Sequence, residues 1–158
     1  MPNREKSMKN FPRGSEWRKW DMHIHSPYSD GYRGTWDQFI RQIQTANCDV
    51  IGVNDYFSVA GYKKLSNSIE SGDVDIQGKV IITEFEMRMT YTLQNKHNNT
   101  KGARHFNYHI IFNNDPEELK IDDVESFIKS LQSNGAIIGS DYDDSAKLAD
   151  KKVSFRDT

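Results

Sequence analysis

The decisive stretch is WDMHIHSPYSDG, residues 20–31. The alternation over residues 20–25 predicts a strand, and the Pro- and Gly-containing segment 26–31 predicts the loop after it. Because residues two apart on a strand share a face, Asp21, His23 and His25 are expected on one side. Two imidazoles placed in this way suit a borderline divalent ion such as zinc, manganese or iron.

An isolated H-x-H pair is common in proteins that bind no metal. The longer string is more restrictive, because Ser26, Ser29, Asp30 and Gly31 follow the pair. Asp30 lies just past the carboxyl end of the expected strand, where α/β folds place their active sites. The stretch as a whole therefore predicts a metal site.

The segments that follow alternate between helix and strand. A capping box at Thr35 and Gln38 begins an expected helix over 36–46, and an apolar strand is expected over 49–54. A second helix over 59–71 and a third strand over 79–88 complete the series. Strand, helix, strand, helix, strand is typical of parallel βαβ units, so the predicted fold class is α/β.

The second half of the chain is patterned differently. Residues 87–93 and 105–112 are β-prone and predict a hairpin with a polar tip at 94–102. Asp115 and Pro116 resemble a helix start, and a helical stripe continues over 122–133. We expect one more short strand at 136–139, followed by a weakly patterned tail over 142–158.

Three later residues are metal ligands by type and lie at strand ends. They are Asp55, Glu86 and His109, and Glu84 shares the expected face of Glu86. Each has an ordinary explanation: a cap for Asp55, an ion pair with Arg88 for Glu86, and a core position for His109. Taken together, four strand ends that each offer a ligand-type residue favour a shared site.

Composition sets limits on this interpretation. The 158 residues correspond to one domain, or to a piece of a larger protein, and the formal net charge of −2 does not indicate a nucleic-acid surface. The single cysteine, Cys48, excludes an internal disulfide and a Cys-based zinc motif, so we expect a reducing, cytoplasmic setting. No apolar run approaches the about 18 residues of a membrane span.

The first 20 residues carry six basic and two acidic side chains. We interpret residues 1–13 as a polar basic leader and residues 14–158 as the domain. The segment is either a solvated leader or an arm that faces phosphate, and Trp17 and Trp20 beside Arg18 and Lys19 keep the second interpretation open.

The motifs resemble the PHP (polymerase and histidinol phosphatase) domain, a distorted (β/α)7 barrel. The family begins with an H-x-H strand and an S-D-G-like loop, which here are His23, His25 and Asp30. It continues with a strand that ends in D-H, then a glutamate and a histidine on the next strands, which here are Asp55, Glu86 and His109. The resemblance implies two or three metal ions that activate water against a phosphate ester.

The similarity is closer still to the N-terminal PHP region of AAA-like or SMC-like ATPases of the TrlF type. It rests on the segments 14–25, 54–58 and 86–88 and covers about residues 14–115. It implies a role in nucleic-acid metabolism or phage defence beside an ATPase domain or partner chain.

Two departures from the family pattern limit what the resemblance implies. Tyr56 stands where most members have a histidine ligand, and no histidine follows His109. A seven-unit barrel also needs more chain than 158 residues. We therefore expect the N-terminal part of a larger barrel, or a reduced and inactive unit.

The predicted function is metal-dependent hydrolysis of a phosphate ester, with a nucleic acid or nucleotide as substrate. The expected metal ligands are His23, His25, Asp30, Glu86 and His109, and catalytic roles are assigned to His23, His25 and Asp55. The alternative is an inactive module that binds metal or nucleotide and regulates or docks an ATPase. A third hypothesis, an amidohydrolase-like enzyme, lacks the further catalytic residues that it needs.

Overall fold

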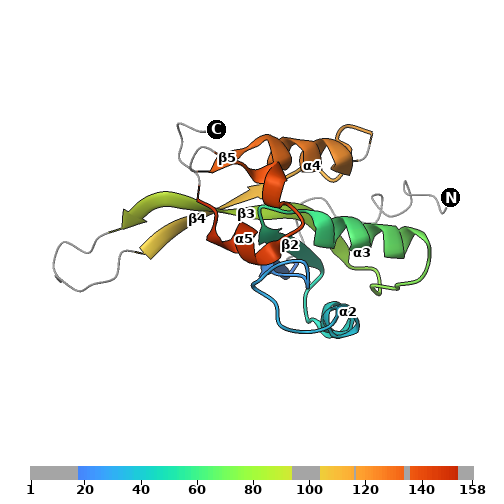
Figure 1. Ribbon diagram of the computed structural model, residues 1–158. Helices are drawn as coiled ribbons and strands as arrows, with labels where there is room; N and C mark the ends of the chain where they lie inside the picture. Colours follow the sequence, from blue (N-terminus) through green and yellow to red (C-terminus); the bar gives the residue numbers. More distant parts are fainter. Residues whose placement is uncertain (1–17, 94–103, 116, 134–135, 153–158) are drawn as a thin grey trace.

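The protein is a mixed α/β structure built on a curled four-stranded sheet that forms half a barrel (Figure 1). The computed structural model describes residues 18–93, 104–115, 117–133 and 136–152. The strands β1 to β4 lie side by side in chain order. Their bounds are Trp20–Ile24, Val50–Tyr56, Val80–Leu93 and Arg104–Ile111.

The first three strands run parallel and are joined by helices. Helix α2 (Trp36–Thr45) connects β1 to β2, and α3 (Ala60–Glu70) connects β2 to β3. The predicted alternation of helices and strands, and with it the α/β class, is confirmed. The carboxyl ends of β1 and β2 consequently lie together, and Tyr56 at the end of β2 pairs with Glu86 in the middle of the longer strand β3.

Strand β4 returns antiparallel to β3, so the predicted hairpin is also confirmed. The two strands form a ribbon that extends away from the helices in Figure 1. The expected hairpin tip, 94–102, and the expected leader, 1–13, lie outside the described residues.

The start of α2 follows the sequence prediction closely. Thr35 Oγ1 accepts the backbone N–H of Gln38 at 3.3 Å, and Gln38 Oε1 accepts that of Thr35 at 2.8 Å. Phe39 and Ile43, one turn apart, are buried from this helix. The cap fixes the start of the helix, and the apolar stripe fixes the side that packs on the sheet.

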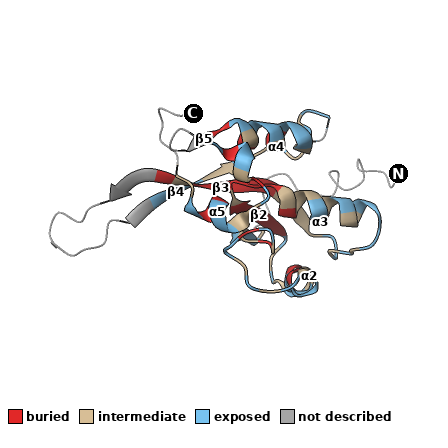
Figure 2. Cartoon of the chain, in the orientation of Figure 1, coloured by how far each residue is buried: buried red, intermediate tan, exposed pale blue. Residues whose placement is uncertain are grey.

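The hydrophobic core lies on one face of the sheet. Ile51 and Val53 of β2 belong to one cluster, and Phe85 of β3 belongs to the other. The register places Phe85 beside Asp55, so these residues share a face of the pleat. Figure 2 shows buried residues along β2 and β3 and exposed residues on the outer sides of the helices. The core residues that the helices contribute are Phe39, Ile43, Leu65, Val124 and Ile128.

The segment after β4 differs in part from the prediction. Helix α4 (Ile121–Ser130) begins at Ile121, and a turn occupies 117–118, so the expected helix start at Asp115 was wrong. Pro116 lies outside the described residues. Helix α4 has no side-chain cap. Asp122 and Asp123 lie in its first turn, where their negative charges interact favourably with the positive end of the helix dipole.

The C-terminal elements are short. Strands β5 (Gln132–Ser133) and β6 (Ala136–Ile137) form a small hairpin, so only half of the strand expected at 136–139 is present. A 3-10 turn, η1 (Ile138–Asp141), follows. The expected unpatterned tail contains helix α5 (Ser145–Asp150), whose Lys147 N–H is capped by the Asp144 carboxylate at 3.1 Å.

Strand β1 contains an irregularity that the sequence pattern did not predict. Asp21 pairs with Ile51 and Ile24 pairs with Val53, so the register shifts by one residue between them. Ile51 and Val53 share the helix-covered face, and Asp21 therefore lies on that side with Ile24. Asp21, His23 and His25 nevertheless line one pocket of about 350 Å³, together with Gln42 and Ile51. The register shift therefore interrupts the predicted alternation of Asp21 and the two histidines without moving Asp21 away from them.

A buried hydrogen-bonded joint ties the end of β1 to β2 and α3. Ser26 donates its backbone N–H to Asp55 Oδ1 at 2.7 Å and its hydroxyl to Oδ2 at 2.6 Å. Gly61, in the first turn of α3, approaches so closely that a Cβ there would lie 2.0 Å from Ser26 Oγ and 2.4 Å from Asp55 Oδ2. Only glycine fits this contact.

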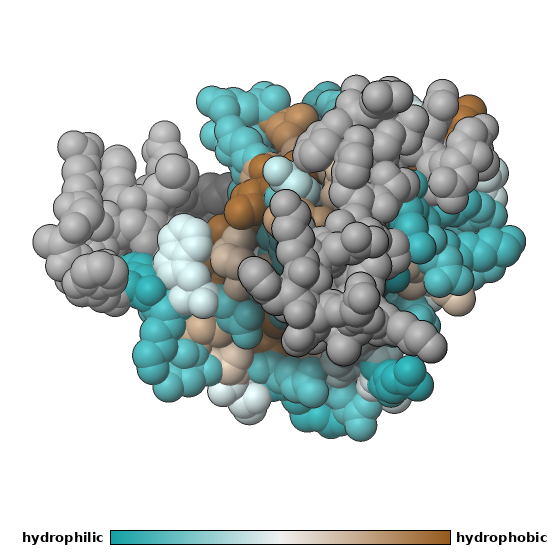
Figure 3. Space-filling model, turned by 90° about the vertical axis from the view of Figure 1, so that its left-hand side faces the viewer, coloured by the Kyte–Doolittle hydropathy of each residue, from teal (hydrophilic) through white to brown (hydrophobic). Residues whose placement is uncertain are grey.

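The described surface is largely hydrophilic. Seen from the side (Figure 3), hydrophilic residues cover much of the described periphery, and hydrophobic residues show between them. Among the helices of the described residues, none combines the length and apolar character needed to cross a membrane.

Replacing Gly61 with alanine should destabilise the fold by about 1–3 kcal/mol, because the new methyl group must displace the Ser26–Asp55 pair. Urea unfolding of the variant measures the loss. Asn67→Ala, an exposed substitution in the same helix, is the control and should change stability by no more than about 0.5 kcal/mol. Equal urea midpoints for Gly61→Ala and Asn67→Ala would show that the contact of Gly61 with Ser26 and Asp55 does not require glycine.

Candidate metal centre

The polar face of the sheet opposite the core carries the candidate site. Glu84 and Glu86 alternate on β3, and Asn54 of β2 pairs with Glu84. His109 of β4 pairs directly with Glu86. All of these side chains therefore project from the same face, and both glutamates are fully buried.

Three imidazoles surround one oxygen of Glu86. The Nε2 atoms of His23 and His25 each lie 3.5 Å from Glu86 Oε2, and Nε2 of His109 lies 3.9 Å from it. The structure thus brings together four of the five residues expected as metal ligands. His23, Glu86 and His109 form the tightest group, with one ligand atom from each within 4.8 Å of the others.

The distances fit a shared cation better than direct hydrogen bonds. A separation of 3.5 Å is too long for a good N–H···O hydrogen bond. Ligands at about 2.1 Å from a tetrahedral zinc ion are separated by about 3.4 Å. The group of His23, Glu86 and His109 could therefore hold a metal ion.

Two asparagines orient the Glu86 carboxylate. Asn54 Nδ2 donates to Oε2 at 3.3 Å, and Asn107 Nδ2 donates to Oε1. Asn54 Nδ2 also lies 3.3 Å from His109 Nδ1. These amides belong to different strands, so the carboxylate is held from both sides while Oε2 still faces the histidines.

His25, just after β1, is more protected from solvent than His23. Burial, together with the neighbouring His23 and His109, lowers its pKa to about 4. The ring is consequently neutral at physiological pH, which is the form that binds metals. Ser29 Oγ lies 3.1 Å from its Nδ1, and the ring of Tyr56 stacks on it at 4.9 Å between centroids.

Glu84 lacks the partners that Glu86 has. Neither of its carboxylate oxygens has a hydrogen-bond partner, and the nearest histidine atom, His109 Nδ1, lies 3.8 Å from Oε2. Burial, together with the neighbouring charges of Glu86 and Asp21, raises its pKa to about 7. Gly52 makes room for this side chain, because a Cβ at residue 52 would lie 2.1 Å from Glu84 Oε1.

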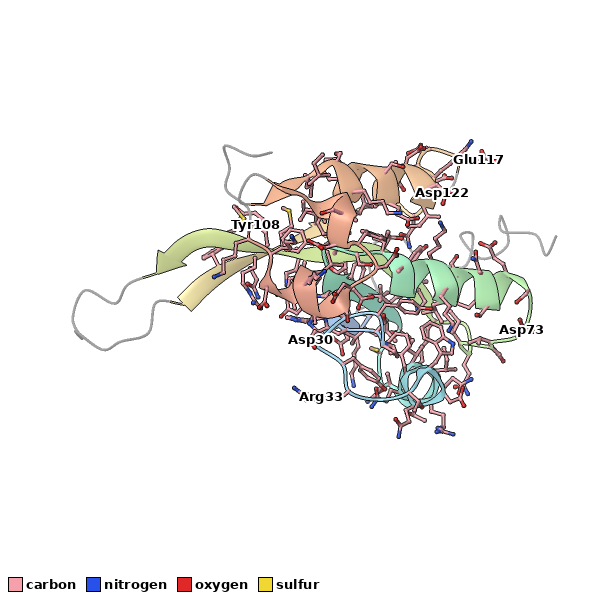
Figure 4. All side chains as sticks on the ribbon, viewed as in Figure 1. Asp30, Arg33, Asp73, Tyr108, Glu117 and Asp122 are labelled. Atoms are coloured by element: carbon pink, nitrogen blue, oxygen red, sulfur yellow. The ribbon has the colours of Figure 1, made fainter. Side chains whose placement is uncertain are left out.

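Two predicted site residues lie outside the group. Asp30 is exposed on the loop between β1 and α2, in the region of Arg33 and far from Asp122 in Figure 4. Asp55 is buried on the core face, where it accepts hydrogen bonds from Ser26. Neither aspartate belongs to the histidine–glutamate group.

Sequence reasoning missed the residues that support the ligands. Asn54 and Asn107 each lie two residues from a position that was singled out, Tyr56 and His109 respectively, so strand alternation could have placed them on the same face. Ser29 was noted only as part of the loop motif. No local signal pairs it with His25.

The chain was also compared with known proteins. No protein-family model matches it, and no curated protein is similar to it.

The stability of the protein should depend on pH through Asp55. Burial raises the pKa of Asp55 to about 6, although hydrogen bonds from Ser26 and Gly61 act in the opposite direction. The folded chain therefore binds this proton more tightly than the unfolded chain, whose carboxyl has a pKa of 3.8. The resulting stabilisation is complete below pH 4 and is lost as the pH rises through 6.

We expect the free energy of unfolding of the wild type to fall by about 2 kcal/mol relative to Asp55→Asn between pH 4 and 7. Urea titrations across this range, with a chelator present, measure the difference. Asp37→Asn, an exposed variant in α2, should follow the wild-type profile. If the free energy of unfolding changed with pH in the same way for the wild type and Asp55→Asn, the pH dependence would not arise from Asp55.

Proposed function

We propose that the chain is a metal-dependent phosphoesterase of the PHP type, and that its sheet is the N-terminal part of a distorted (β/α)7 barrel. The observation that carries the proposal is the single buried oxygen of Glu86 with three imidazole nitrogens around it. The parallel βαβαβ arrangement and the curl of the sheet support the barrel. The H-x-H strand, the glutamate and the histidine also follow the family order.

The proposed ligands are His23, His25, Glu86 and His109, which would bind Mn, Zn or Fe through nitrogen and carboxylate oxygen. Bound ions of this kind supply Lewis acidity and lower the pKa of coordinated water. Two or three ions, with Asp30 as a further ligand, follow from the family resemblance. The resemblance also favours a nucleic acid or nucleotide as the phosphate ester, and an ATPase domain or partner chain beside this one.

The protein side chains have separable tasks in this proposal. His23 is 58% exposed, so the group remains open to solvent and to a substrate. Asn54 and Asn107 keep the Glu86 carboxylate oriented. Asp55 acts indirectly, because it holds Ser26, the residue that follows His25, and thereby fixes the end of β1.

One observation favours a second candidate function, a non-catalytic module that binds metal or nucleotide and docks or regulates an ATPase. Tyr56, at the position of a family histidine ligand, stacks on His25. A phenol is a poor ligand at neutral pH, so this position would hold an ion less tightly than a histidine while the other ligands stay in place. Tight binding of Mn²⁺ without hydrolysis of any phosphate ester would favour this function.

Replacing Glu86 with glutamine should remove metal binding and hydrolysis together. The change keeps the shape of the side chain but removes the charge that the three histidines surround. We expect the rate of bis-p-nitrophenyl phosphate hydrolysis with Mn²⁺ to fall at least about 100-fold, beyond the usual effect of losing an outer-shell partner. Elemental analysis of the purified protein should show less bound metal.

The matched control is Glu117→Gln, an exposed glutamate before α4 that is labelled in Figure 4. It should retain wild-type metal content and rate. If the wild type binds no metal and hydrolyses no phosphate ester, or if Glu86→Gln equals the wild type in both respects, the proposed function is wrong.

A further inference from the structure

Arg88 lies beside the candidate metal centre and on the same face of the sheet. It follows Glu86 by two residues on β3 and pairs with Asn107, just as Glu86 pairs with His109. The side chain is half-buried. Its Nη1 donates a hydrogen bond to the carbonyl oxygen of Ala149 in α5 at 2.8 Å, which fixes one arm of the guanidinium.

Tyr56 connects Arg88 to the candidate ligands. The guanidinium carbon of Arg88 lies 5.1 Å from the centre of the Tyr56 ring, within cation–π distance. The same ring stacks on His25 at 4.9 Å, with 30° between the planes. Arg88 is therefore only one aromatic ring away from a proposed metal ligand.

Arg88 forms no ion pair with any carboxylate of the described residues. No Asp or Glu of the described residues lies within the 4.0 Å of an ion pair with it, so the ordinary explanation of Glu86 as its partner does not hold. Glu86 is instead engaged by Asn54, Asn107 and the histidines. A guanidinium stays protonated at any physiological pH and carries five N–H donors, of which the Ala149 carbonyl uses one.

We propose that Arg88, supported by Tyr56, is an oxyanion-binding position that takes a phosphoryl oxygen of the substrate. The guanidinium is planar and matches two oxygens of a phosphate, and its contacts with Tyr56 and Ala149 limit its motion before the ligand arrives. Its positive charge also offsets the negative charge of Glu84 and Glu86 for an approaching anion. This inference deepens the proposed function and rests on it for the choice of phosphate as the oxyanion.

The test is calorimetric titration of inorganic phosphate into the full chain, both with Mn²⁺ bound and after chelation. Arg88→Gln should weaken phosphate binding about 10- to 100-fold, the range expected when a charge-assisted hydrogen bond is lost. Arg88→Lys keeps the charge but not the planar guanidinium, so its affinity for phosphate should lie between those of the wild type and Arg88→Gln. Arg41→Gln, an exposed arginine of α2, is the control and should bind phosphate like the wild type.

Thermal unfolding separates a binding role from a purely structural one. Phosphate should raise the Tm of the wild type but not that of Arg88→Gln, whatever the starting Tm of the variant. Equal phosphate affinities for wild type, Arg88→Gln and Arg88→Lys would overturn the inference, as would phosphate binding that Arg41→Gln weakens equally. Failure of the proposed function looks different: the wild type would lack Mn²⁺ binding or hydrolysis, while the titrations after chelation would still report on Arg88.

Discussion

A carboxylate buried from water must be matched by hydrogen-bond donors or positive charge, and Glu86 imposes this requirement on its surroundings. The amide of Asn54 reaches it from β2 and that of Asn107 from β4, while His23 of β1 and His25 just after β1 face it. These partners come from the regions of β1, β2 and β4, the three other strands of the four-stranded sheet. The pairing registers of all four strands must therefore stay fixed for the buried carboxylate to keep its partners. The core on the opposite face maintains those registers.

Much of this arrangement could be anticipated from local pattern. Helix α2 begins where its capping residues indicate. His23 and His25 approach Glu86 because β1 and β2 end beside the middle of β3, and His109 joins them through the antiparallel pairing of β4. The register shift in β1 could not be anticipated, since it depends on pairing with β2. The start of α4 was also misplaced: Asp115 and Pro116 have the chemistry of a cap, but the chain turns before the helix forms. Helix α5 is too short for periodicity to identify.

Asp55 illustrates how strand alternation decides between two roles for one residue type. Its neighbours Asn54 and Tyr56 point toward the candidate metal centre, and Asp55 points into the core side of the sheet. There it binds Ser26 and leaves room only for Gly61 at the start of α3. The sequence correctly indicates an acidic residue at the end of this strand. In the folded chain, however, Asp55 accepts hydrogen bonds from Ser26 and so fixes the backbone instead of binding metal.

The origin of the three closest ligands has a consequence for how the chain assembles. His23, Glu86 and His109 belong to strands far apart in sequence. An ion that bound all three would cross-link segments that are distant in sequence. The cross-link would offset part of the entropy lost when the loops between these segments close during folding. Cation binding would then add to the stability of the folded chain, by an amount that grows with the concentration of the free cation.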